Sequence, residues 1–214
     1  MMVLTLVCAW SCAVLVAAEY ARLRTLRAVS KTAASAAFVT LGALLYGGGS
    51  YGQLIVAGLV LGAGGDLALL GKSNKAFLAG LGLFLFGHLA YVAAFASLMP
   101  AHLWLAGAGP LAALPYVAGG VVLWLLWPKL GSMKVPVIFY VVTIATMVSF
   151  AISAWRTHAL PDPARTRMIA GALLFFASDL AVARDKFVAT TFTNKAWGLP
   201  TYYAAQLFIA WSLF

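Results

Sequence analysis

The sequence predicts an all-α membrane protein, a bundle of eight transmembrane helices that forms a single domain over residues 1–214. Of the 214 residues, 64% are hydrophobic and only 9% are charged. One water-soluble core of this size cannot bury so many apolar side chains, and little of the chain is left for a soluble domain. The apolar residues also fall in runs of roughly 20, the length that a helix needs to cross the hydrocarbon core of a bilayer.

Eight such runs follow one another with short gaps, so neighbouring helices should be antiparallel. The first run has no positively charged stretch before it, which favours a first membrane helix over a signal peptide. Within it, Cys8 and Cys12 lie one helical turn apart, as expected of small buried residues that form no disulfide. The fifth run contains Pro110 and Pro115, which predict a kink or a late start. The expected spans are residues 2–20, 31–48, 51–70, 76–99, 104–127, 134–155, 167–184 and 197–214.

The net charge of +9 is carried by residues that flank these runs. A basic chain can bind nucleic acid, but Lys and Arg confined to membrane-flanking gaps set topology instead, so we expect no nucleic-acid partner. Eleven of the fourteen Lys and Arg residues fall in the gaps after the first, third, fifth and seventh spans. The positive-inside rule then places these gaps in the cytoplasm and both termini outside (N-out/C-out), in the cytoplasmic (inner) membrane of a bacterium.

The two halves of the chain resemble each other weakly. Lys31-Thr32 opens the second span and Lys134-Val135-Pro136 opens the sixth, while GDLALLGK ends the third and SDLAVARDK ends the seventh. This correspondence is consistent with two four-helix repeats of the same orientation, related by an axis along the membrane normal.

Two of the five acidic residues, Asp66 and Asp179, lie inside hydrophobic runs, each in the phrase Asp-Leu-Ala. An ionisable group at membrane depth is costly, so it marks a function or a specific partner. With a rise of 1.5 Å per residue, Asp66 lies about 6 Å inside the cytoplasmic end of its helix, and Asp179 lies at a similar depth. We therefore expect both carboxyl groups in one layer. The alternative is a buried ion pair, for example with Lys31.

Polar side chains of other helices fall in the same cytoplasmic-side layer, whereas the periplasmic half of the spans is nearly free of them. His88 and Tyr91 share one helix face, as do Tyr203 and Gln206. A single Tyr or Gln in a membrane helix is more often a packing or hydrogen-bonding residue, and Tyr202 also suits an interfacial aromatic belt. The residues that converge on the layer are Lys31, Asp66, His88, Tyr91, Lys134, Tyr140, Asp179, Tyr202, Tyr203 and Gln206.

The motifs GDLALL, GLGLFLFGHLAYVAAF, GALLFFASDLAVA and TYYAAQLFIA follow one another in this order. Together they resemble the YhhN family, the lysoplasmalogenases, over nearly the whole chain from Lys31 to the C-terminus. One departure is Thr32, where the family usually has Pro, and it affects the helix start more than any chemistry. The family pattern falls on Lys31, Gly65-Asp66, His88 with Tyr91, Ser178-Asp179, and Tyr202-Tyr203 with Ala205-Gln206.

The resemblance implies an eight-helix hydrolase that cleaves the vinyl ether of a lysoplasmalogen, a lysophospholipid taken from the bilayer. The products would be a fatty aldehyde and glycerophosphoethanolamine or glycerophosphocholine. A vinyl ether hydrolyses by protonation at carbon, which gives an oxocarbenium ion that water attacks. Glycosidases handle a similar ion with two carboxyl groups, one protonated and one ionised.

As a hypothesis, Asp66 and Asp179 are this catalytic pair, and the sequence does not assign which of them is the acid. The side chains that would position water or the glycerol hydroxyl are His88, Tyr203 and Gln206. The lipid phosphate would bind the rim residues Lys31 and Lys134. The candidate substrate-binding set is completed by Tyr91, Tyr140, Ser178 and Tyr202.

Two other functions stay open at this point. A small transporter or lipid-binding protein could use the Asp pair as a proton or cation site, although a permeation path should show polar groups through the midplane. A zinc-dependent hydrolase could use Asp66, His88 and Asp179, but the other two histidines fall on the opposite side, so neither a metal nor another cofactor is expected. The head group, the chain length and the oligomeric state are not determined by the sequence.

Overall fold

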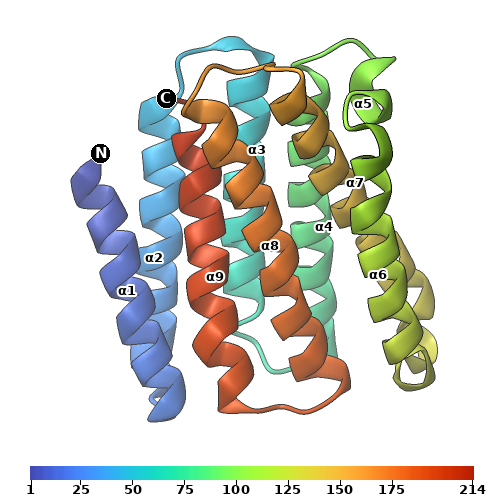
Figure 1. Ribbon diagram of the computed structural model, residues 1–214. Coiled ribbons are helices and arrows are strands. Elements are labelled where there is room, and N and C mark those ends of the chain that lie inside the picture. Colours follow the sequence, from blue (N-terminus) through green and yellow to red (C-terminus); the bar gives the residue numbers. More distant parts are fainter.

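The computed structural model describes residues 1–214 as helices joined by short connections, with no strand. The long helices lie side by side along one common direction (Figure 1). Their bounds are α1 (Met2–Tyr20), α2 (Arg24–Leu45), α3 (Gly49–Ala68), α4 (Asn74–Ala96), α5 (Leu103–Ala106), α6 (Ala113–Leu126), α7 (Lys134–Arg156), α8 (Ala164–Phe187) and α9 (Phe192–Trp211).

Seven helical segments are long and apolar enough to cross a membrane, which agrees with the expected all-α membrane protein. The eighth expected span corresponds to α9, which is 20 residues long but is not one of the seven. It includes Asn194, Lys195, Pro200 and Gln206, which lower its hydropathy. Nevertheless α9 lies inside the bundle, where it packs against α1, α2, α3 and α8 (Figure 1).

The fifth expected span, residues 104–127, is interrupted rather than continuous. The four-residue helix α5 is followed by a 3₁₀ turn, Gly109–Ala112, which contains Pro110. Only then does α6 begin, with Pro115 in its first turn, where a helix tolerates proline because the backbone N–H has no partner there. The late start expected from the two prolines is therefore confirmed.

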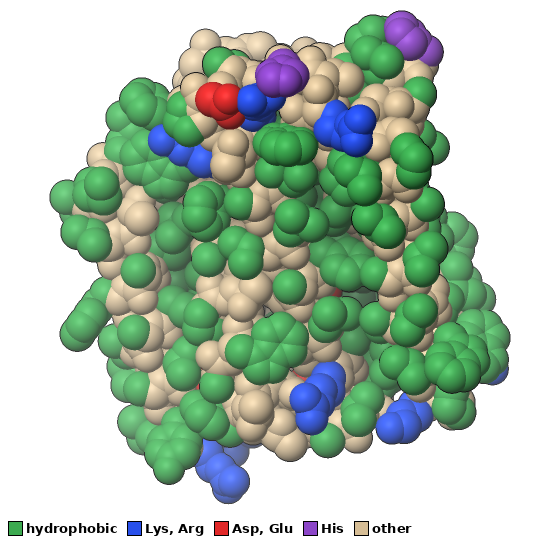
Figure 2. Space-filling view, viewed as in Figure 1, with side chains coloured by type: hydrophobic (Ala, Val, Ile, Leu, Met, Phe, Trp, Pro, Cys, Tyr) green, Lys and Arg blue, Asp and Glu red, His purple; other side chains and the backbone are tan.

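The connections that were expected to share one side do so. The α1–α2, α3–α4, α6–α7 and α8–α9 connections lie at the lower end of Figure 1, and both chain termini lie near the upper end. We call the lower end, which includes Arg22, Lys72, Lys129 and Lys186, the basic end. Figure 2 shows that hydrophobic side chains cover the middle of the molecule, while charged side chains lie towards the two ends.

The packing leaves α6 at the edge of the bundle. This helix packs chiefly on α7 and on the short 3₁₀ helices at its two ends, whereas α4 and α8 pack on the other side of α7. The main core contains no residue of α6 and surrounds fully buried side chains such as Phe38, Leu41, Tyr91 and Tyr203. Space therefore remains between α6 and the rest of the bundle. On the face of the molecule that Figure 2 presents, a hollow is visible between α8 and α6.

Candidate functional site

One cavity of about 1020 Å³ occupies this space, and every α-helix except α5 contributes to its lining. It opens at the basic end, where Arg22, Lys72 and Thr190 of three different connections line it. Both Asp66 and Asp179 are among the lining residues. The volume lies at the upper end of the range for pockets that bind small ligands. The two carboxyl groups that the sequence singled out thus belong to one cavity.

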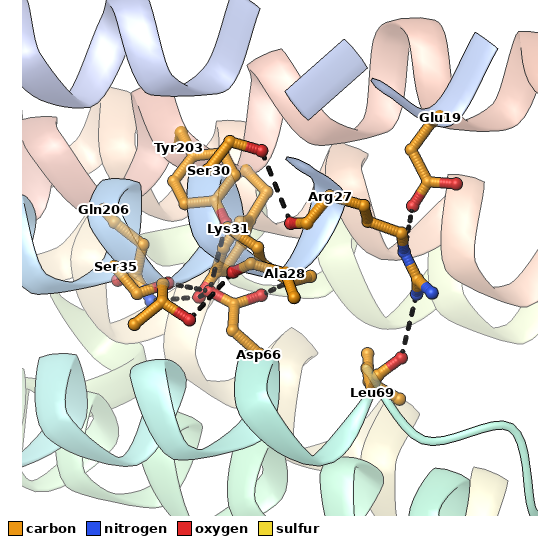
Figure 3. Close-up of polar contacts among 12 residues, drawn as sticks. Glu19, Arg27, Ala28, Ser30, Lys31, Ser35, Asp66, Leu69, Tyr203 and Gln206 are labelled. Carbon is orange, nitrogen blue, oxygen red and sulfur yellow. Dashed lines mark hydrogen bonds and ion pairs between the residues drawn. The ribbon is translucent and has the colours of Figure 1, made fainter. Parts of the chain in front are cut away.

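Asp66, on α3, is held by side chains of two other helices (Figure 3). Its Oδ1 forms an ion pair with Nζ of Lys31, and these side chains are only 1% and 6% exposed. Its Oδ2 accepts hydrogen bonds from Ser35 Oγ at 2.7 Å, Tyr202 OH at 2.9 Å and Tyr203 OH at 3.5 Å. A carboxylate can be buried when it is both paired and hydrogen-bonded, and Asp66 meets both conditions. The ion pair with Lys31, an alternative that the sequence left open, is present.

A chain of hydrogen bonds extends this cluster to α4. Gln206 Nε2 donates to Tyr202 OH at 3.1 Å, and Gln206 Oε1 accepts from Tyr91 OH at 2.7 Å. All three side chains are buried. Tyr91, Tyr202, Tyr203 and Gln206 therefore belong to one network around Asp66, which ties α9 to α3 and α4.

Small residues on α3 make this network possible. A Cβ atom at Gly58 would lie 2.7 Å from Cδ1 and 2.8 Å from Cζ of Tyr91, closer than non-bonded carbon atoms approach. The absence of a side chain at Gly58 thus lets the Tyr91 ring lie against the α3 backbone, from where its hydroxyl reaches Gln206.

We expect Gly58→Ala to destabilise the protein by about 1–3 kcal/mol, because overpacking forces the buried Tyr91 ring to move. Gly82→Ala is the matched control, since Gly82 lies within α4 and has no neighbouring atom within 4 Å of its Cβ position. Alanine is the better helix former by about 1 kcal/mol, so this control should be neutral or stabilising. Thermal unfolding in detergent measures both. Equal melting temperatures of the two variants would contradict the close contact at Gly58.

Asp179, on α8, belongs to a second and different cluster. Its Oδ2 accepts a hydrogen bond from Tyr140 OH of α7 at 2.9 Å and lies 3.6 Å from Nε2 of His88 of α4. The other ring nitrogen of His88, Nδ1, is 2.7 Å from the carbonyl oxygen of Phe84. The side chain of Asp179 is 17% exposed, and no Lys or Arg forms an ion pair with it. The two carboxyl groups therefore share a cavity but differ in their partners.

Aromatic rings connect the two clusters. The Phe175 ring lies 4.4 Å from the His88 ring and 5.4 Å from the Tyr202 ring, measured between centroids. Phe84 contacts both Phe175 and Tyr202 in the same edge-on manner. Asp66 and Asp179 are thus linked through an apolar wall and not through a direct hydrogen bond.

Two candidates from the sequence do not join either cluster. The ammonium group of Lys134 lies 4.6 Å from the centre of the Trp127 ring, and Lys134 is not among the residues that line the cavity. Ser178 lines the cavity, but its hydroxyl donates to the carbonyl oxygen of Phe175 in its own helix at 2.8 Å.

An interhelical bridge lies at the basic end beside Asp66. Arg27 of α2 pairs with Glu19 of α1 at 2.6 Å and donates to the carbonyl oxygen of Leu69, just after α3, at 3.1 Å (Figure 3). Arg27 and Glu19 line the cavity, so this bridge also forms part of its mouth.

Sequence reasoning missed several of these residues. Ser35 is the clearest case, because it follows Lys31 by four residues and must share a helix face with it, which was a usable signal. Arg27 entered the sequence analysis only as one of the counted basic residues in the gap after the first span, and Glu19 was not considered. Phe175 carried no signal, since one Phe in an apolar run is indistinguishable from its neighbours.

The residues do not support a zinc site. No three His, Cys, Asp or Glu side chains come together where they could hold a metal ion. His88 contacts Asp179, while Asp66 belongs to the separate cluster around Lys31. A catalytic zinc needs about three protein ligands around one ion, so the geometry does not favour the zinc-dependent hydrolase.

Comparison with known proteins decides the family. The model of the YhhN family matches residues 26–213, nearly the whole chain. The chain belongs to the YhhN family. The resemblance carried by the short motifs is therefore confirmed, and the YhhN motif residues Lys31, Asp66, His88, Asp179 and Gln206 all lie in the two clusters just described.

Several curated relatives are similar to this YhhN-family chain. Lysoplasmalogenase TMEM86A of Bos taurus is 34% identical over 170 residues, which covers 74% of this chain and 64% of the relative. Lysoplasmalogenase TMEM86B of Rattus norvegicus is 34% identical over 165 residues, covering 77% and 63%. The lysoplasmalogenase of Mycobacterium tuberculosis is 30% identical over 167 residues, covering 75% and 60%. The matched region thus spans less than two thirds of each relative, and no solved structure matches the chain.

Proposed function

We propose that this YhhN-family chain is a lysoplasmalogenase, a membrane hydrolase that cleaves the vinyl ether bond of a lysoplasmalogen to a fatty aldehyde and a glycerophospho-head group. The observation that carries the proposal is one cavity whose wall includes both carboxyl groups from inside the apolar runs, Asp66 and Asp179, and whose mouth lies at the basic end of a membrane bundle. Relatives named lysoplasmalogenase support the substrate class.

The carboxyl groups suit the reaction. One carboxylic acid gives its proton to the second carbon of the alkenyl chain; its O–H bond breaks and a C–H bond forms with the π electron pair. The first carbon becomes an oxocarbenium ion stabilised by the ether oxygen. Water adds to that carbon and returns a proton to the carboxylate. The resulting hemiacetal transfers its hydroxyl proton to the ether oxygen and breaks the C–O bond, which releases aldehyde and glycerol hydroxyl. Asp66 and Asp179 are the catalytic pair, one as acid and one as the negative charge that faces the cation.

The mouth of the cavity suits a phospholipid head group. Arg22 and Lys72 are exposed, line the mouth from two connections and form no ion pair within the chain. They are free to bind a phosphate through charge-assisted hydrogen bonds. We assign the phosphate to them instead of Lys31 and Lys134, because Lys31 neutralises Asp66 and Lys134 lies outside the cavity.

The deeper wall of the cavity suits a hydrocarbon tail. It is formed on the α6 and α7 side by apolar side chains that include Val122, Leu123, Val141 and Ile144. A lysophospholipid would place its tail along this wall and its head group at the mouth. The vinyl ether, which joins the two parts, would then lie at the depth of the carboxyl groups.

The test is aldehyde release by the purified full chain in detergent. The substrate is an alkenyl lysophosphatidylethanolamine, and the control is the alkyl ether lipid with the same head group and chain length but no double bond. We expect aldehyde from the first lipid only. Failure to cleave either lipid, together with proton-coupled uptake in vesicles, would favour the transporter instead.

We further propose that α9 is an eighth span of this single domain, that both termini face outward, and that the chain resides in the cytoplasmic membrane of a bacterium. The charge distribution supports this orientation, because the basic end carries most of the Lys and Arg residues. The mycobacterial relative supports the bacterial setting.

An alkaline phosphatase fused after Phe214 should be active, since that enzyme works only outside the cytoplasm. An inactive phosphatase, with an active cytoplasmic reporter at the same position, would reverse the orientation. The two four-helix repeats stay a prediction.

A further inference from the structure

His88 has one ring nitrogen without a partner. The His88 side chain is 1% exposed, and its Nε2 is buried with no hydrogen bond. Buried polar atoms in folded proteins are nearly always paired, so an orphaned one requires an explanation. The carboxyl group of Asp179 faces it, with Oδ2 at 3.6 Å, slightly longer than a hydrogen bond.

The hydrogen bond at the other ring nitrogen determines which tautomer is present. Nδ1 faces the carbonyl oxygen of Phe84 at 2.7 Å, and a carbonyl oxygen can only accept, so the hydrogen is on Nδ1. In a neutral ring Nε2 is then an acceptor. An acceptor that faces an ionised carboxylate in a buried site is repelled, whereas a carboxylic acid can donate its proton to it.

The surroundings of the His88 ring favour this neutral arrangement over an ion pair. The titratable groups in contact with the ring are Asp179 from α8 and Tyr140 from α7, and the apolar ring of Phe175 packs against it as well. The charged pair of Lys31 and Asp66 lines the same cavity from α2 and α3 but does not touch the ring. Two opposite charges on His88 and Asp179 would both have to be desolvated, while one shared proton avoids that cost.

We propose that His88 is a positioning residue that acts through Asp179: its Nε2 accepts a hydrogen bond from the carboxylic acid O–H and so keeps Asp179 protonated near neutral pH, which makes Asp179 the acid and Asp66 the permanent negative charge. This inference rests on the proposed lysoplasmalogenase function. Asp66 is excluded as the acid because an ammonium group and three hydroxyl groups already occupy its two oxygens. Tyr140 donates to Asp179 Oδ2, so that oxygen can accept from Tyr140 while it donates to His88.

In the reaction Asp179 gives this proton to the second carbon of the alkenyl chain and becomes a carboxylate. It recovers a proton from the water that attacks the oxocarbenium ion, so the acid is regenerated in each turnover. His88 itself gains and loses no proton during a turnover. Its part is to hold the proton on Asp179 between turnovers, because the catalytic pH range of an acid depends on its protonation in the free enzyme.

The experiment is the pH dependence of kcat/KM for aldehyde release by the full chain, by His88→Phe and by His88→Gln. Phe keeps the ring packing but removes the Nε2 acceptor, so protonated Asp179 loses its hydrogen-bond partner. The fall of kcat/KM on the alkaline side of the pH profile should therefore move to lower pH by about one unit. Gln offers an amide oxygen near the position of Nε2, and its alkaline limb should stay close to that of the natural chain. A charged His88 predicts the opposite shift for Phe, to higher pH, because the loss of a cation favours protonated Asp179. A shift to higher pH, or no shift, would overturn the inference.

A second measurement needs no activity. Infrared difference spectra of the natural chain and Asp179→Asn should contain the carbonyl stretch of a protonated carboxylic acid near neutral pH. His88→Phe should lose this band at the same pH. If the band is present in a chain that releases no aldehyde, the proposed function fails while the arrangement of His88 and Asp179 stands. If the band is absent near neutral pH, the inference fails whatever the activity is.

Discussion

Asp179→Asn is expected to lower kcat for aldehyde release by roughly 10²–10⁴-fold, the range that a general acid contributes. The amide has nearly the same shape as the acid and still accepts a hydrogen bond from Tyr140, so the fold should persist. It cannot deliver a proton to carbon, so the first step of the reaction loses its acid. Steady-state kinetics, with the melting temperature as a check on folding, measure the effect.

The control for this variant is Asp162→Asn. Asp162 lies in the α7–α8 connection at the opposite end from the cavity, where it pairs with Arg165 at 2.6 and 2.7 Å. The guanidinium of Arg165 holds the pKa of this exposed carboxyl below its usual range. We expect normal activity from this variant. Undiminished aldehyde release by Asp179→Asn would remove Asp179 from the chemistry.

The second large effect is expected on stability. Lys31→Met should lower the free energy of unfolding by about 3–5 kcal/mol, because it leaves the charge of the fully buried Asp66 without its counter-ion. The double variant Lys31→Met with Asp66→Asn removes both charges and should recover much of this loss. It should remain inactive, since the negative charge that faces the oxocarbenium ion is gone.

Melting temperatures of the two single variants and the double variant in detergent form a double-mutant cycle for the pair. Lys134→Met is the matched control, because this lysine also lies at the basic end but only stacks on Trp127, an interaction of about 0.5–1 kcal/mol when partly exposed. If Lys31→Met proves as stable as Lys134→Met, the ion pair does not hold α2 against α3.

Patterns along the chain were enough to predict the parts of the fold that depend on the bilayer. Apolar run lengths located the helices, and the Lys and Arg residues of the gaps identified the connections that share one end (Figure 1). The two prolines predicted the late start of α6. The sequence patterns did not predict the separate helix α5, because four apolar residues between turns have no periodicity of their own.

The sequence predicted most of the polar side chains of the two clusters, but not which of these side chains contact each other. The cost of a charge at membrane depth singled out Asp66 and Asp179, and both line the cavity. The choice of partners depends on side-chain contacts between helices far apart in sequence, such as Lys31 with Asp66 and His88 with Asp179. The family pattern falls on Lys31 and not on Lys134, but apolar run lengths and charge counts treat the two lysines alike, and only the structure places Lys31 in a buried ion pair and Lys134 outside the cavity. For the same reason the difference between the two carboxyl groups became visible only in the structure.

The central claim is that a carboxylic acid in the cavity protonates the alkenyl chain at carbon. It is tested most directly by turning over a lysoplasmalogen in D₂O with the purified protein and trapping the aldehyde at once as the alcohol by reduction. We predict one solvent-derived deuterium on the second carbon of the product, more than an added aldehyde standard acquires under the same conditions. Aldehyde released without deuterium at that carbon, or no release of aldehyde at all, would contradict the account.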